Sequence, residues 1–196
     1  MIRRGHPASV HKDAAQELTA AQSRLRSRRR FLIAGAGGSL ALLFGIPAAT
    51  AKSGDPWPVL EVVLNHLLPS EPDSPGAAEI NALDYLRFVV GDPKVDGEER
   101  EFILQGVSWL EELARQRHPD GFMALDEVAR EELLQQIAGS AAGENWLATL
   151  LTYLFEALLT APAYGGNPGG VAWRWLAYIP GFPLPGPGTR YMDLPL

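Results

Sequence analysis

The fold is decided by residues 144–160, which read Glu144-Asn145-Trp146-Leu147-Ala148-Thr149-Leu150-Leu151-Thr152-Tyr153-Leu154-Phe155-Glu156-Ala157-Leu158-Leu159-Thr160. Large apolar side chains come in pairs at every turn, at positions 146 and 147, 150 and 151, 154 and 155, and 158 and 159. This spacing matches the 3.6-residue period and predicts one helix from about Glu144 to Thr160. A helix that is apolar around most of its circumference either lies centrally in a bundle or faces another protein.

Four more helices are predicted upstream of this stretch. Asp55 followed by Pro56 is typical of a helix start, and Pro69 ends that helix. The others are expected at about 77–90, from an Asp96 cap to the turn at His118, and at about 125–138. No segment shows the alternating pattern of a strand. The sequence therefore predicts an all-α fold, a small bundle of about five helices within residues 52–161.

The composition changes after Ala161, because residues 162–196 are rich in proline, glycine and aromatic side chains. Such an apolar segment either folds back on the bundle or docks on another chain. Its glycines allow tight turns that would hold the aromatic side chains at a fixed angle to the last helix. Large aromatic residues are frequent anchors of protein interfaces. We therefore predict a docking tail with these contact residues: Tyr164, Gly165, Gly166, Asn167, Trp173, Trp175, Tyr178 and Phe182.

The N-terminal residues 1–51 have the pattern of a twin-arginine (Tat) export signal. Arg28, Arg29, Phe31 and Leu32 form its core, after a cationic region expected to be disordered and before an apolar run from 31 to 49. Ala49-Thr50-Ala51 predicts cleavage near Ala51. We expect recognition by the Tat translocase, export of the folded protein and a periplasmic location, with association with the inner membrane left open. An apolar run of this length can just span a bilayer, so an uncleaved anchor is the alternative.

The charge balance excludes nucleic-acid binding. The chain has 17 Lys+Arg and 23 Asp+Glu. Residues 1–51 contain 8 Lys+Arg and 2 Asp+Glu, so residues 52–196 contain 9 Lys+Arg and 21 Asp+Glu. A net charge of 9 − 21 = −12 repels a phosphate backbone. The chain contains no cysteine, which excludes thiolate metal sites, iron–sulfur ligation and cysteine nucleophiles.

No pattern in the sequence predicts catalytic, cofactor-binding or metal-binding residues. His66 and His118 are far apart in the sequence, and the acidic residues on the predicted helices are typical of solvated faces. Residues 165–170 are rich in glycine, but a nucleotide-binding loop needs a preceding strand, and here a helix precedes it. Pro168 also removes one backbone N–H donor from this segment.

Two stretches resemble the gluconate 2-dehydrogenase subunit 3 family. Residues 158–173, Leu158-Leu159-Thr160-Ala161-Pro162-Ala163-Tyr164-Gly165-Gly166-Asn167-Pro168-Gly169-Gly170-Val171-Ala172-Trp173, are similar to its C-terminal signature. Leu68-Pro69-Ser70 and residues 73–77 resemble the turn after its first helix. The chain departs from the family pattern by an inserted Ile179 and a proline-rich extension.

The resemblance implies a non-catalytic small subunit of a periplasmic dehydrogenase of sugars or sugar acids. In such complexes a large subunit of the GMC oxidoreductase type holds FAD, and a multihaem cytochrome c subunit takes the electrons onward. Whether a cytochrome joins here is left open. The small subunit would aid folding and stability of the large one and carry it through the Tat route. Two rival hypotheses are an autonomous enzyme and a membrane-tethered helical binding module that retains its leader as an anchor.

Overall fold

The computed structural model describes residues 54–186, 188–190 and 193. The predicted Tat signal and its cleavage site lie outside these residues. Within them the elements are helical and no strand occurs, which confirms the all-α prediction. In chain order they are α3 (Trp57–Leu67), α4 (Ala82–Gly91), α5 (Gly97–Arg115), η1 (Phe122–Ala124), α6 (Glu127–Ala138), α7 (Ala141–Leu159), η2 (Pro162–Tyr164), η3 (Pro168–Gly170) and α8 (Val171–Trp175).

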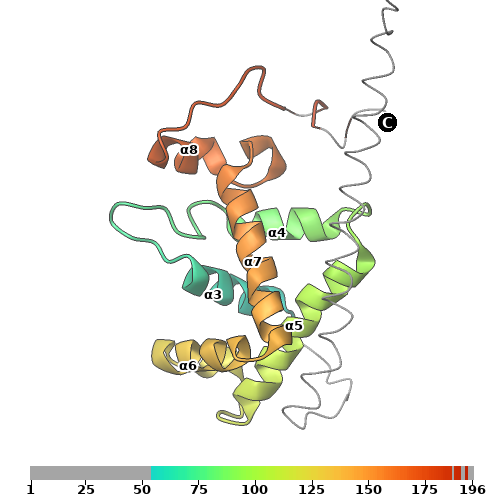
Figure 1. Ribbon diagram of the computed structural model, residues 1–196, viewed down its shortest axis with the longest axis vertical. Helices are drawn as coiled ribbons and strands as arrows, with labels where there is room; N and C mark the ends of the chain where they lie inside the picture. The colour runs from blue at the N-terminus through green and yellow to red at the C-terminus, as the bar shows by residue number, and fades with distance from the viewer. Residues whose placement is uncertain (1–53, 187, 191–192, 194–196) are drawn as a thin grey trace, which may run out of the picture.

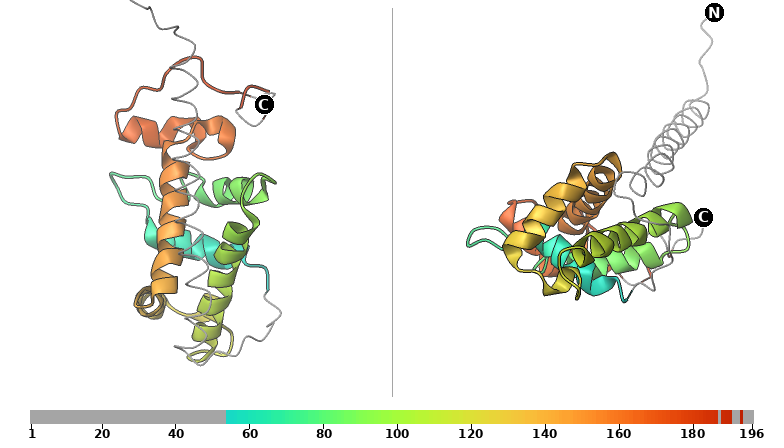
Figure 2. Two further views of the ribbon diagram at one scale, coloured as in Figure 1. Left: turned by 45° about the vertical axis from the view of Figure 1, so that its right-hand side comes forward. Right: turned by 90° about the horizontal axis from the view of Figure 1, so that it is seen from below.

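Helix α7 is the axis of the bundle. Helices α3, α4, α5 and α6 pack against it along its length, and α8 packs at its C-terminal end (Figures 1 and 2). It buries Trp146, Leu150, Leu154 and Leu158 in the core, while Phe155 and Leu159 lie on its outer face. Of the two arrangements that its composition predicts, the central position is therefore present, and the residues that the structure describes still leave one face of the helix uncovered.

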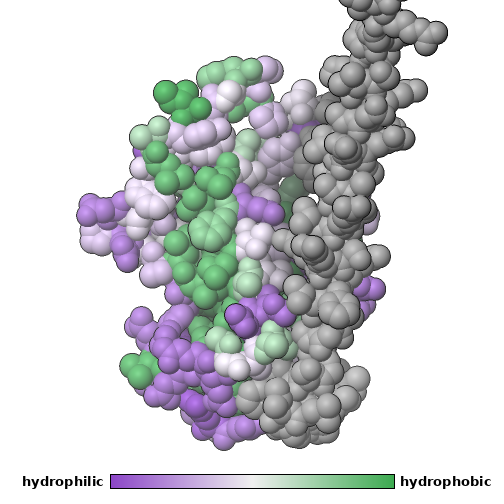
Figure 3. All heavy atoms as spheres, viewed as in Figure 1, coloured by the Kyte–Doolittle hydropathy of each residue, from purple (hydrophilic) through white to green (hydrophobic). Residues whose placement is uncertain are grey.

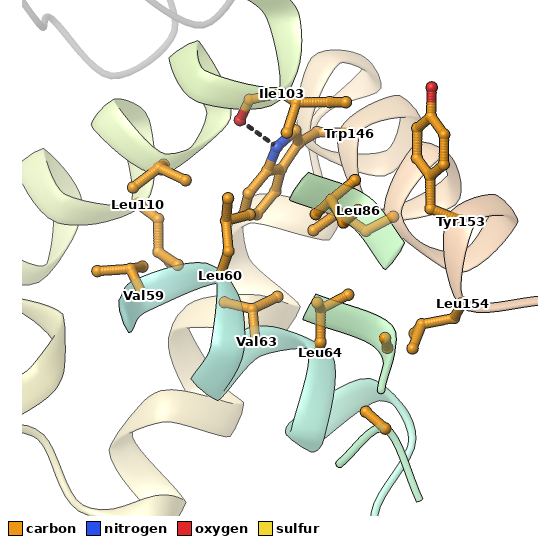
Figure 4. Packing of buried hydrophobic residues seen from close by; sticks show 14 of the residues in the cluster. Val59, Leu60, Val63, Leu64, Leu86, Ile103, Leu110, Trp146, Tyr153 and Leu154 are labelled. Carbon is orange, nitrogen blue, oxygen red and sulfur yellow. Dashed lines mark hydrogen bonds between the residues drawn. The ribbon is translucent and has the colours of Figure 1, made fainter. Parts of the chain in front are cut away.

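Trp146 sets the crossing of α7 with α5. Its side chain is fully buried, and its Nε1 donates a hydrogen bond to the Ile103 carbonyl oxygen at 3.0 Å (Figure 4). A Cβ on Gly106 would lie 2.1 Å from this Nε1 atom. Only glycine therefore lets the α5 backbone approach the indole ring so closely. The core of the bundle includes the fully buried residues Leu60, Leu64, Ile80, Leu86, Ile103, Leu110, Phe122, Leu133, Ile137 and Leu150.

Side-chain caps fix three helix starts. Asp96 accepts a hydrogen bond from Glu98 N at 3.2 Å, Asp126 from Ala129 N at 2.9 Å, and Ser140 from Gly143 N at 3.0 Å. Such a cap satisfies one of the N–H groups that the first turn leaves without a partner. The Asp96 start was predicted. The Ser140 cap was not, and α7 therefore begins at Ala141, before the predicted Glu144.

The second helix also begins at a different residue from the one predicted. Residues 77–81 form turns, and α4 starts at Ala82 because Asn81 adopts the left-handed conformation with φ 58°. The turn before it is fixed by Glu79, whose carboxylate accepts hydrogen bonds from Ser70 Oγ at 2.6 Å and from Gly76 N at 3.0 Å. The hydrogen bond from the Ser70 hydroxyl has the largest effect on the pKa of Glu79 and lowers it below its usual value; hydrogen bonds from backbone N–H groups lower it further.

One polar contact joins the last turn of α3 to α6. His66 Nε2 donates a hydrogen bond to the Glu131 carboxylate, which also accepts one from the Gln135 side chain. The His66 hydrogen bond, and to a lesser extent the one from Gln135, lower the pKa of Glu131. Among the described helices, none is both long enough and apolar enough to cross a membrane.

Candidate functional site

The segment from Tyr164 to Trp173, here called the α7 cap, closes the C-terminal end of α7. The last carbonyl groups of any helix have no partner within that helix. Here Trp173 Nε1 donates to the Leu159 carbonyl oxygen at 3.0 Å, and Asn167 Nδ2 donates to that of Thr160 at 3.1 Å. Two short 3₁₀ turns, η2 and η3, bring these donors back over the helix end. The cap is thus built to terminate α7 and to start α8 at a fixed place.

Asn167 is the centre of the α7 cap and is fully buried. While its Nδ2 binds the end of α7, its Oδ1 accepts a hydrogen bond from Ala172 N at 2.8 Å, at the start of α8. Its backbone N–H donates to the Ile80 carbonyl oxygen at 2.8 Å. Its φ of 48° lies in the left-handed region, which asparagine tolerates better than most residues. One side chain therefore joins α7 to α8, and its backbone joins both to the turn before α4.

Two further contacts hold the α7 cap against the bundle. A Cβ on Gly166 would lie 2.7 Å from the Ala157 carbonyl oxygen, so this glycine packs directly on the α7 backbone. Asn81 Nδ2 donates to the Gly165 carbonyl oxygen at 2.8 Å across 84 positions of sequence. Gly166 and Asn167 of the α7 cap are therefore needed for this chain's own fold.

The structure divides the predicted contact residues into three groups. Gly166, Asn167 and Trp173 are buried within this chain, Tyr164 and Gly165 are half-buried, and Trp175, Tyr178 and Phe182 are exposed. The Trp173 ring, only 8% exposed, packs over the end of α7 and is not available as an exposed anchor. The sequence could not predict this burial of Trp173, because an aromatic side chain can be buried either within its own chain or against a partner. The interface stays a prediction, and of its residues Trp175, Tyr178 and Phe182 are the ones exposed in this structure.

The exposed apolar surface has a second part on α7, the helix that its composition predicts to lie centrally or to face another protein. Its exposed residues are not among the individual contact residues predicted from the sequence. Phe155 and Leu159 on the outer face of α7 are 61% and 56% exposed. The sequence pattern could have indicated this exposed face. A helix that packs on one side needs one large apolar residue per turn, and α7 has two. Figure 3 shows this face as hydrophobic residues along α7 and again over α8 and the tail. We call the following residues the apolar surface: Phe155, Leu159, Trp175, Leu176, Tyr178, Ile179, Phe182 and Leu184.

A shallow groove lies beside the α7 part of this surface. It has a volume of about 460 Å³ and is lined by Tyr85, Thr152, Phe155, Glu156, Leu159 and Thr160. Tyr85 Oη donates a hydrogen bond to Glu156 Oε2 at 3.2 Å, which fixes the carboxylate at the edge of the groove. The groove offers apolar side chains with one acidic group at its edge, an arrangement suited to receiving an apolar side chain of a partner.

The histidines and acids considered from the sequence lie apart from this surface. His66 contacts Glu131 between α3 and α6, and His118 Nδ1 lies 3.9 Å from Asp120 Oδ2 in the turn after α5. In the part of the chain that the structure describes, no group of three His, Cys, Asp or Glu residues is placed to hold a metal ion.

Comparison with known proteins finds a matching family. The model of a family described as gluconate 2-dehydrogenase subunit 3 matches residues 55–181, which include every helix from α3 to α8. Neither the curated proteins nor the solved structures give a match.

Proposed function

This chain belongs to the gluconate 2-dehydrogenase subunit 3 family, and we propose that it is the non-catalytic small subunit of a periplasmic dehydrogenase complex. The family is that of a subunit of a multi-subunit dehydrogenase. In the proposal, the partner is a large subunit of the GMC type that binds FAD and oxidises a sugar or sugar acid. This chain would contribute no cofactor of its own. It would stabilise the large subunit and export it through the Tat route.

The observation that carries the proposal is the apolar surface. Phe155 and Leu159 come from a helix that is otherwise the centre of the core, and the exposed aromatic residues of the tail follow directly after α8. Soluble monomers rarely leave large apolar side chains gathered in this way, and such patches usually mark interfaces. Covering this surface with a second protein would complete the burial of α7 on both faces.

The α7 cap supports the same proposal by its rigidity. The side chains of Asn167 and Trp173 donate hydrogen bonds to the end of α7, and Asn167 also accepts one from the start of α8. These bonds fix the direction in which α8 leaves the bundle. A surface held in one arrangement before association loses less conformational entropy on binding. The cap would then act as a positioning element of the interface while making little direct contact with the partner.

A pair of substitutions tests the proposal. Phe155→Asp places a charge on the outer face of α7, and Val128→Asp places one on α6 at a residue that is 70% exposed and outside the apolar surface. Both variants should fold, since neither side chain is buried. Burying an exposed phenylalanine is worth on the order of 2 kcal/mol, so Phe155→Asp should weaken capture of the flavoprotein by roughly tenfold or more.

The readout is the amount of large subunit, and of its flavin absorbance, that co-purifies with tagged small subunit after co-expression. Val128→Asp should retain the partner at the level of the unsubstituted chain. Equal retention by Phe155→Asp would show that the outer face of α7 is not the contact, and the proposed role of the surface would then be abandoned.

The export part of the proposal rests on the twin-arginine pattern of residues 27–32. Replacing Arg28 and Arg29 together with lysine keeps the charge and removes the guanidinium pair that defines the signal. Both subunits should then stay in the cytoplasm. Export of the large subunit in cells carrying this variant would show that it travels independently.

A further inference from the structure

The tail after α8 forms an arm, residues 179–186, that is held at both ends. At its start, Tyr178 N donates a hydrogen bond to the Trp173 carbonyl oxygen at 2.8 Å, and the two aromatic rings lie 5.9 Å apart. After its end, Arg190 forms a paired contact with Asp193, with Nε–Oδ2 at 2.8 Å and Nη2–Oδ1 at 3.2 Å. The Arg190 guanidinium also lies 6.0 Å from the Phe88 ring on α4. Figure 1 shows the arm leaving α8 and passing above the end of α7 in that view.

The arm presents apolar side chains outward and carries no charge. Ile179 and Phe182 are 85% and 82% exposed, the largest values among the big apolar side chains of the described chain. No charged residue occurs from position 175 to position 189, in a chain whose residues 52–196 carry a net charge of 9 − 21 = −12. Prolines at 180, 183 and 185 restrict the backbone further. An arm with these properties suits insertion into an apolar pocket.

The arm also coincides with the limit of the family match. That match ends at residue 181, so it includes the bundle, the α7 cap and the outer face of α7 but leaves out Phe182 and the residues that follow. The α7 part of the apolar surface thus belongs to the region that resembles the family, and most of the arm does not.

We propose that the arm is a specificity element: it inserts Ile179 and Phe182 into an uncharged apolar pocket of this chain's own large subunit and so distinguishes that subunit from the large subunits of other family complexes. The proposal rests on the proposed function. The occupant is a large subunit because the arm continues the apolar surface directly from α8. A second copy of this chain is disfavoured by the repulsion between two domains of net charge −12.

The test is a competition for a limiting amount of tagged large subunit, with the full-length chain and a variant co-expressed in the same cells. The variant Ile179→Ser/Phe182→Ser removes both apolar side chains from the arm, and Val128→Ser is the matched control on α6. Since all three side chains are exposed, both variants should keep the thermal unfolding midpoint of the unsubstituted chain. The chain's own large subunit should capture roughly tenfold less of the arm variant than of the unsubstituted chain. It should capture Val128→Ser as well as it captures the unsubstituted chain.

A second large subunit, from a family complex whose small subunit lacks the arm, should capture the arm variant and the unsubstituted chain equally. Equal capture of the arm variant by its own large subunit would overturn the inference. If Phe155→Asp still loses capture in that case, the proposed function stands without the specificity role. If neither variant loses capture, both ideas fail. Sedimentation of the isolated chain provides a further check. If the unsubstituted chain is a dimer and the arm variant is a monomer, a second copy of this chain binds the arm, and the inference is overturned.

Discussion

At the scale of single residues, the signature motif of this chain is a device for ending a helix. Asn167 uses a donor and an acceptor of one side chain to join Thr160 to Ala172, and Trp173 supplies the remaining donor to Leu159. The residue types follow from the geometry, because a left-handed backbone, a buried amide and a close approach to α7 are all required within a few positions. The stretch that resembles the family's C-terminal signature therefore has a structural explanation within this chain.

Replacing Asn167 with alanine should destabilise the chain strongly. The substitution removes the hydrogen-bond partner of the buried Ala172 N and of the partly buried Thr160 carbonyl oxygen, and it places an alanine at a positive φ. Each of these effects costs on the order of 1–3 kcal/mol. Urea denaturation of the purified chain measures the loss.

Asn65→Ala is the control for this prediction. Asn65 Nδ2 donates only to the Glu61 carbonyl oxygen within the exposed part of α3, at 2.9 Å. Its removal should change the free energy of unfolding by less than about 0.5 kcal/mol. Similar losses for Asn65→Ala and Asn167→Ala would contradict the central role assigned to Asn167.

A second prediction at this scale concerns acid. The pKa of Glu131 is lowered in the folded state, mainly by the hydrogen bond from His66, below the usual value of a glutamate carboxyl group. The folded state therefore binds a proton less readily than the unfolded state. The stabilisation is complete above about pH 5 and is lost as the pH falls through the lowered pKa. Between about pH 5 and pH 3, the free energy of unfolding should fall less steeply for Glu131→Gln than for the unsubstituted chain.

Chemical denaturation of both chains at a series of pH values checks this prediction. Parallel curves for Glu131→Gln and the unsubstituted chain would mean that the contact between α3 and α6 does not stabilise the fold.

At the scale of elements, local signals predicted the existence of the helices better than their starts. Periodicity indicated where helices occur, and the Asp96 cap gave the correct start of α5, since both depend on residues close in sequence. Helix α7 starts early because Ser140 caps it even though Gly143, a poor helix former, lies in its first turn. A Cβ on Gly143 would lie 2.0 Å from the Ile137 carbonyl oxygen. The late start of α4, after Asn81, depends on a hydrogen bond to Gly165, which is 84 positions away, so local sequence rules could not predict it.

The crossing of α5 and α7 gives the prediction at this scale. Gly106→Ala puts a methyl group where the Trp146 ring lies, at 2.1 Å from its Nε1, and should force the two helices apart. Overpacking of this kind costs roughly 1–3 kcal/mol, or more when the neighbour cannot move. Gly97→Ala, in the first turn of the same helix, meets no atom within 4 Å and should be neutral or slightly stabilising. Thermal unfolding compares the two, and a tolerated Gly106→Ala would show that this crossing is looser than described.

At the scale of the whole molecule, the distribution of apolar side chains is the feature that points beyond the chain. The sequence predicted a helix too apolar for one covered face, and the structure locates the excess at Phe155 and Leu159. Composition alone could not separate Trp173, which the chain buries itself, from Trp175 and Phe182, which it leaves exposed. That separation depends on the path of the α7 cap, and so on contacts between distant segments. The arm beyond residue 181 adds exposed side chains that the family pattern does not include.

The central claim is that a flavoprotein covers the apolar surface. Purification of the tagged, full-length chain from periplasm under native conditions tests it most directly, by the mass of what elutes and by its absorbance spectrum. We predict that a larger second chain elutes with this one in equal amounts and that the complex has the spectrum of bound flavin. Elution of this chain as a colourless, stable monomer would contradict the claim.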